Sequence, residues 1–168
     1  MPVPIGPGTA IGDLSSFAQE VIDMIVVAGI DDSHLAVTVV EHALLEAGHR
    51  NAELHVVHVF NAPPMYDAGY GIFPLDIEKL AQAERERVWS AVAGLLEAAR
   101  VPTERVDLEG YPPDALIAYA QNVGGSLLVV GTRGRGDLAA LILGSTSHRA
   151  IHLAPCDVLV VKPAHAER

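Results

Sequence analysis

The sequence predicts an α/β fold in which a parallel sheet is covered by helices on both faces. Short apolar segments alternate with longer segments whose apolar residues recur at helical spacing. The short segments are apolar along most of their length, as expected for strands buried on both faces. The chain has 168 residues, which is the size of one domain. Since strands separated by helices run parallel through right-handed crossovers, we expect a single doubly wound domain with a five-stranded parallel sheet.

The expected strands lie at residues 24–30, 54–60, 106–109, 127–130 and 158–161. A first helix is expected from about Ser33, with Gly48 ending it. An amphipathic helix is expected over residues 75–100, and two further helices begin at Pro112 and Ser145. The second strand leads into a long loop rich in proline and glycine, and loops of this kind are often functional.

The domain is expected to span residues 23–163, with an extension at residues 1–22 and a tail at residues 164–168. The extension is rich in proline, glycine and small polar residues. It is interpreted either as a loosely held tail or as a segment that docks on a partner subunit.

Composition narrows the range of partners. The net charge is −10 and the chain has two lysines, so a nucleic-acid-binding surface lacks its usual electrostatic basis. No apolar stretch approaches the ~20 residues that span a bilayer, so we expect no membrane partner. Cys156 is the single cysteine, and the first residues show neither a basic region nor a long apolar one. These features favour the cytoplasm.

The most informative motif follows the fourth expected strand. It consists of Gly131-Thr132-Arg133-Gly134, nine residues, and then Gly144-Ser145 at a helix start. Glycine lets main-chain N–H groups approach a ligand, and a helix N-terminus adds unpaired donors and positive dipole charge. The pattern therefore predicts a phosphate site, with a flexible turn between strand and helix as the alternative.

This motif resembles the hallmark of the nucleotide-binding branch of the universal stress proteins, which is Gly-x-x-Gly, nine residues, then Gly-Ser or Gly-Thr. Three other segments agree in order, namely residues 30–33, 110–112 and 154–161, so the resemblance covers residues 24–162. It implies the strand order 3-2-1-4-5 and a crevice between the first and fourth strands. The implied ligand is ATP with Mg²⁺.

The resemblance, taken with the motif, implies this nucleotide-binding set: Gly29, Ile30, Asp31, Val59, Val130, Gly131, Arg133, Gly134, Gly144, Ser145 and Thr146. Asp31 either accepts hydrogen bonds from ribose hydroxyls, helps to hold hydrated Mg²⁺, or caps the following turn. Gly29 and Ile30 stand where the family often has Pro-Thr, and Thr146 stands where valine is frequent. The adenine contacts are therefore less directly implied than the phosphate contacts.

Other catalytic and metal motifs are not matched. Neither lysine follows a glycine, which excludes a P-loop. His55 and His58 are three apart in one strand and point to opposite faces, so they cannot jointly hold a metal. His148 and His152 share a helix face without an evident third ligand. We expect no metal site formed by the protein and no catalytic residue.

The leading functional hypothesis is a cytoplasmic ATP-binding regulator or sensor of the stress response, which signals by nucleotide-dependent conformation or dimer state. A slow ATP hydrolase, or a phosphoryl- or adenylyl-transfer enzyme using the same site, is one alternative. A ligand-free dimeric assembly module is another. The resemblance also implies a homodimer that pairs the last strand across a two-fold axis. Its pairing residues are Val158, Leu159, Val160 and Val161.

Overall fold

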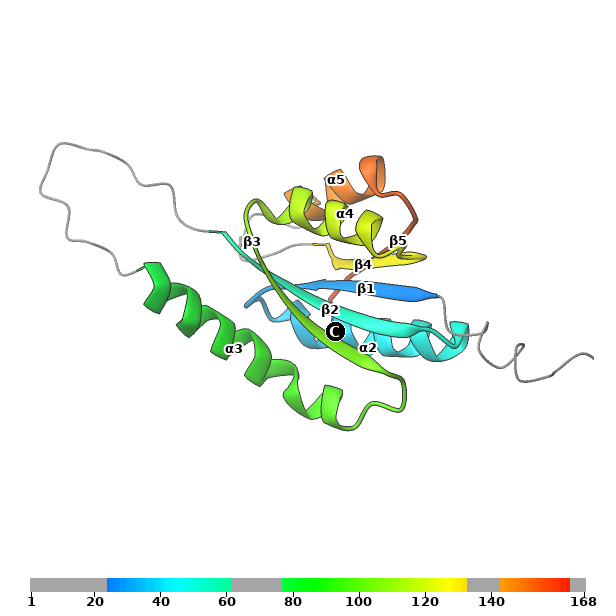
Figure 1. The fold of residues 1–168 in the computed structure, drawn as a ribbon, viewed down its shortest axis with the longest axis horizontal. Helices are drawn as coiled ribbons and strands as arrows, with labels where there is room; N and C mark the ends of the chain where they lie inside the picture. The colour runs from blue at the N-terminus through cyan, green and yellow to red at the C-terminus, as the bar shows by residue number, and fades with distance from the viewer. Residues whose placement is uncertain (1–23, 62–76, 133–142, 164–168) are drawn as a thin grey trace, which may run out of the picture.

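A computed structural model describes residues 24–61, 77–132 and 143–163 of the chain. Within these residues, five strands form one parallel sheet in the order β3-β2-β1-β4-β5 (Figure 1). The strands are β1 (Ile25–Ile30), β2 (Glu53–Phe60), β3 (Thr103–Glu109), β4 (Leu127–Gly131) and β5 (Asp157–Val161). The helices are α2 (Leu35–Arg50), α3 (Ile77–Glu97), α4 (Pro112–Asn122) and α5 (Ser145–Leu153). The predicted fold class and strand order are confirmed.

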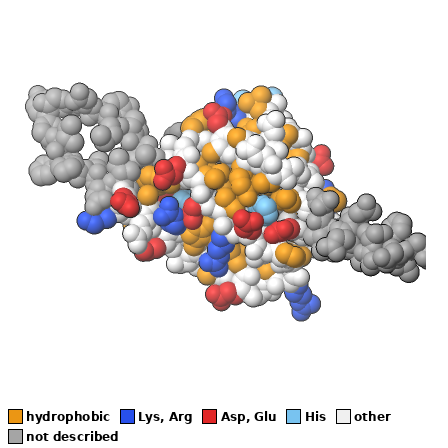
Figure 2. Space-filling view, in the orientation of Figure 1, with side chains coloured by type: hydrophobic (Ala, Val, Ile, Leu, Met, Phe, Trp, Pro, Cys, Tyr) orange, Lys and Arg blue, Asp and Glu red, His pale blue; other side chains and the backbone are white. Residues whose placement is uncertain are grey.

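The helices cover both faces of the sheet (Figure 1). Because alternate strand residues point to opposite faces, Val26 and Ala28 pack with α2 and α3, whereas Val27 packs with α4 and α5. The space-filling view shows apolar side chains gathered over the middle of the molecule, with charged groups scattered around them (Figure 2). None of the described helices has the length and hydrophobicity that a bilayer span requires.

Several element boundaries differ from the sequence expectation, and two of the differences have a clear physical cause. Helix α2 continues past Gly48 to Arg50, so the prediction that Gly48 ends it was wrong. Asn51 closes the helix instead, with φ 51° in the left-handed region, and its N–H donates to the carbonyls of Ala47 and Gly48. Asparagine tolerates this conformation better than most residues. Strand β3 begins at Thr103 rather than Val106 because it pairs with β2 from Leu54 onward.

The register places the carboxyl ends of the central strands side by side. Gly29 of β1 pairs with Val57 of β2 on one side and with Val130 of β4 on the other. The chain leaves β1 toward α2 on one face, whereas α5, which follows β4, lies on the other face. This is the switch point of a doubly wound sheet, where ligand crevices form.

A buried polar cluster ties α3 to the sheet. His58 of β2 is 1% exposed, with Nδ1 3.0 Å from Oδ1 of Asp107 on β3 and Nε2 3.2 Å from Oε1 of Glu84 on α3. The indole N–H of Trp89 also donates to Asp107. Burying an imidazole or a carboxylate without a partner costs free energy. The hydrogen bonds among these side chains offset that desolvation cost.

We expect His58→Leu to lower the free energy of unfolding by about 3 kcal/mol, because the substitution removes the His58 contacts to the buried Glu84 carboxylate and to Asp107. Denaturant unfolding at neutral pH measures the loss. Adding Glu84→Leu to His58→Leu should recover part of it, and His49→Gln on the exposed end of α2 serves as the control. Unchanged stability of His58→Leu contradicts the interpretation.

Candidate functional site

A cavity of about 350 Å³ opens at the carboxyl ends of β1 and β4, at the switch point of the sheet. Its volume lies in the range of small-molecule sites. Five segments surround it: the end of β1 with the start of α2, the end of β2, the start of α4, the end of β4, and the start of α5. The cavity therefore combines the strand-end and helix-start positions that the sequence indicated.

Every predicted nucleotide-binding residue that the structure describes lines this cavity. They are Gly29, Ile30, Asp31, Val59, Val130, Gly131, Gly144, Ser145 and Thr146. Arg133 and Gly134, which belong to the same predicted set, lie outside the described residues. The structure thus brings together side chains and main chain from β1, β2, β4 and α5.

Gly29 allows a close approach between β1 and α4. A Cβ atom at this position would lie 2.7 Å from Cδ1 of Leu116 and 3.4 Å from Cγ1 of Val130. Leu116 is buried and lines the cavity, so the missing side chain lets it pack directly on the strand. Gly29 therefore has a packing role beside the cavity.

Asp31 takes part in the turn between β1 and α2. The N–H of Ser33 donates to Oδ1 of Asp31 at 3.1 Å, and the N–H of Leu35 donates to Oγ of Ser33 at 3.4 Å. Asp31 thus forms the turn, which was one of its expected alternative roles, whereas the N-cap residue of α2 is His34, without a side-chain cap hydrogen bond. Because the same carboxylate lines the cavity, turn formation and ligand binding are compatible.

The start of α5 forms the polar wall of the cavity. Gly144 is the N-cap residue and has no side chain to cover the first-turn amides of Ser145 and Thr146. The N–H of Gly144 donates to the Thr132 carbonyl at 2.8 Å, and the Ser147 hydroxyl donates to the same carbonyl at 3.2 Å. These bonds tie the two ends of the glycine-rich segment together. The wall presents main-chain donors and the positive end of a helix dipole, which together favour an anion.

Several lining residues were not in the predicted set: Ser33, Leu35, Ala36, Val39, Asn61, Tyr111, Pro112, Leu116 and Ser147. Tyr111 and Pro112 belong to the segment 110–112 that carried part of the resemblance, which was a usable signal. Asn61 directly follows β2, at the same sheet edge. The apolar residues of α2 carry no local signal, since helical spacing identifies them only as core.

Cys156 does not have the character of an activated nucleophile. Burial raises the pKa of its thiol, the neighbouring Asp157 carboxylate raises it further, and a backbone hydrogen bond at Leu128 opposes the shift. A raised pKa keeps the thiol protonated at neutral pH, which favours a packing role.

The fold and the cavity define a class: doubly wound α/β domains with a ligand crevice at the sheet's switch point. Residues 24–162 match the Universal stress protein family, and the chain belongs to this family. Universal stress protein A homolog 1 of Coxiella burnetii is 34% identical over 137 residues, covering 81% of this chain and 94% of the relative. Universal stress protein MJ0531 of Methanocaldococcus jannaschii is 29% identical over 143 residues, with 84% of each chain covered.

Solved structures share the fold. The universal stress protein UspA from Lactobacillus plantarum superposes with a TM-score of 0.69 at 22% identity, covering 82% of this chain and 97% of its own. A universal stress protein in complex with cAMP gives 0.55 at 26% identity, with 84% and 98% covered. One from Archaeoglobus fulgidus in complex with dAMP gives 0.61 at 23% identity, with 83% and 98% covered.

Proposed function

We propose that the chain binds an adenine nucleotide, ATP with Mg²⁺, in the cavity at the carboxyl ends of β1 and β4. In this proposal it is a cytoplasmic regulator or sensor of the stress response that signals through nucleotide-dependent conformation or dimer state. The observation that carries the proposal is the amino end of α5, which has no side-chain cap among the described residues and lines a cavity of about 350 Å³. Membership in the universal stress protein family supports the link to stress.

The lining of the cavity combines two kinds of chemistry that suit a nucleotide. Val39, Leu116 and Val130 form apolar surface that fits a base, while Ser145 and Thr146 offer main-chain donors for phosphates. The chain carries a net charge of −10, so anion binding depends on these local dipoles rather than on overall charge. A structural neighbour in complex with cAMP supports the choice of an adenine nucleotide.

Calorimetry of the full chain with ATP and Mg²⁺ tests the proposal. We expect saturable binding of one nucleotide per chain. Mass spectrometry of the denatured protein identifies any nucleotide retained through purification, which separates ATP from ADP and cyclic nucleotides. The absence of binding at millimolar ligand overturns the proposal.

Ser145→Pro isolates the contribution of one main-chain donor. Proline is tolerated at the first helical position, and Gly144, with φ −64° and ψ 162°, already has the conformation required before proline. Ser145→Ala removes only the hydroxyl and is the matched control. Since a hydrogen bond to a charged group contributes about 1.5–3 kcal/mol, we expect Ser145→Pro to bind ATP about tenfold more weakly than Ser145→Ala. Equal affinities of the two variants contradict a phosphate position at this helix end.

Asp31→Asn removes a charge from the cavity but keeps an oxygen that accepts the Ser33 N–H. We expect an unchanged fold and about tenfold weaker binding of ATP in the presence of Mg²⁺, because the carboxylate is proposed to hold ribose hydroxyls or hydrated Mg²⁺. Asp32→Asn is the matched control, since Asp32 pairs with Arg87 and does not line the cavity. Calorimetry of both variants makes the comparison. Wild-type affinity in Asp31→Asn refutes a ligand role for this carboxylate.

We propose further that two copies pair through β5. This strand lies at the edge of the sheet, and its Val158, Leu159 and Val160 remain half-buried in the single chain. An apolar edge strand with unpaired main-chain groups is a site for association unless another chain covers it. Light scattering should report a dimer, and a monomer at micromolar concentration contradicts the proposal.

A further inference from the structure

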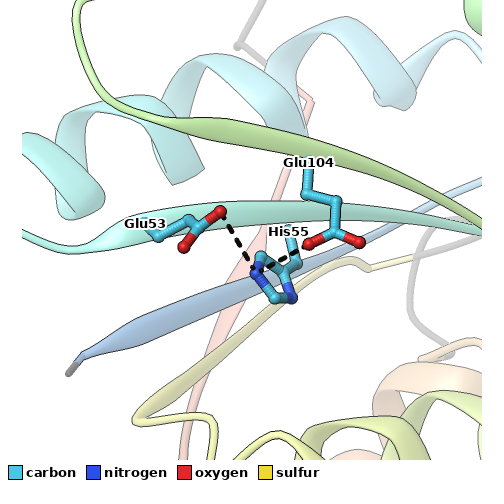
Figure 3. A group of neighbouring side chains, drawn as sticks. All are labelled: Glu53, His55 and Glu104. Atoms are coloured by element: carbon cyan, nitrogen blue, oxygen red, sulfur yellow. Dashed lines mark ion pairs between the residues drawn. The ribbon is translucent and has the colours of Figure 1, made fainter. Parts of the chain in front are cut away.

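A second polar cluster lies at the end of the sheet opposite the cavity. Glu53 is the first residue of β2, and His55 follows it on the same face of the strand. Glu104 of β3 is the register partner of His55. Figure 3 shows the two carboxylates directed toward the His55 ring from either side. One potential ligand atom from each residue lies within 4.8 Å of the others.

The orientation of His55 is fixed by α4. The His55 side chain is 8% exposed, and its Nδ1 lies 2.9 Å from the hydroxyl of Tyr119. The other ring nitrogen, Nε2, faces Oε1 of Glu53 at 3.7 Å and Oε2 of Glu104 at 3.4 Å. A hydrogen bond on one ring nitrogen that sets the direction of the other is the usual support of a metal-ligating histidine.

The separations between Nε2 and the two carboxylates are close to those between the ligand atoms of a metal site. A lone pair on Nε2 that faces two carboxylates is repulsive unless a cation lies between them, either a proton or a metal ion. A tetrahedral zinc ion bound at about 2.0–2.2 Å holds its ligand atoms about 3.3–3.6 Å apart.

We propose that Glu53, His55 and Glu104 form a binding site for a divalent metal ion of the zinc class. Imidazole with carboxylate suits zinc, whereas magnesium and calcium prefer oxygen ligands alone. Two carboxylates and a neutral imidazole balance the charge of a divalent ion. The Glu53 and Glu104 side chains are 37% and 55% exposed, so an ion reaches the site from solvent and the carboxylates move to complete its coordination.

The charges of the same two carboxylates also act on the phenol of Tyr119. Burial raises the pKa of its phenol, and the charges of Glu104 and then Glu53 raise it further. In the proposed site the phenol oxygen accepts the His55 Nδ1–H, which leaves the Nε2 lone pair for the ion. Tyr119 is a positioning residue for the proposed site.

Zinc titration of the full chain tests the proposal, with calorimetry for affinity and stoichiometry and NMR for the histidine rings. We expect one saturable site at micromolar zinc, a shift of the His55 ring resonances on the first equivalent, and a higher Tm with zinc. Glu104→Gln and Glu53→Gln should each weaken binding at least about tenfold, and Tyr119→Phe about tenfold. Both glutamates lie at the surface, so these substitutions leave the core intact.

Two controls make the result decisive. Glu109→Gln removes another exposed carboxylate of β3 outside the cluster and should leave zinc affinity unchanged. His148→Gln with His152→Gln removes the exposed histidine pair of α5, whose rings lie 4.9 Å apart, and should also leave the site intact. Full affinity in both Glu104→Gln and Glu53→Gln, loss of the site only in the His148 and His152 variant, or no saturable site in the wild type overturns the proposal.

Discussion

The pairing of β1 with both β2 and β4 is the constraint on which the rest of the structure depends. β1 hydrogen-bonds on both edges, and its Val26, Val27 and Ala28 are fully buried. A strand that is hydrogen-bonded on both edges and covered on both faces must be apolar throughout. The chain leaves the sheet at the carboxyl end of the strand. The helices after β1 and β4 then lie on opposite faces, and the carboxyl ends of these two strands open into the cavity.

The two ends of the sheet carry opposite chemistry. At the carboxyl end, the strands meet the start of α5, whose first amides receive no side-chain cap from the described part of the chain. At the amino end, Glu53 and Glu104 come from adjacent strands and flank His55. The first arrangement favours anions through main-chain dipoles, and the second favours cations through side-chain charge. The parallel arrangement produces both, because the amino ends of the strands lie together at one end of the sheet and the carboxyl ends lie together at the other.

The sequence predicted the fold well where the signal was local. Buried strands such as residues 127–130 are recognisable as continuous apolar runs, and the glycine-rich motif located the wall of the cavity. The start of β3 was missed because Thr103 and Glu104 are polar residues of an edge strand, which the pairing with β2 determines. The Glu53, His55 and Glu104 cluster was missed for the same reason. His55 and His58 face opposite sides of the sheet, and nothing local in the sequence indicates that His55 pairs with Glu104 of β3.

Helix α4 connects the two proposed sites physically. Leu116 packs on Gly29 at the cavity floor, and Tyr119, one turn further along the same helix, contacts His55. The absent Cβ of Gly29 sets how closely the helix approaches β1, and the His55 contact sets its position over β2. The two contacts hold the same helix against the sheet at two points. Close packing at one end of the sheet is thereby linked to polar geometry at the other.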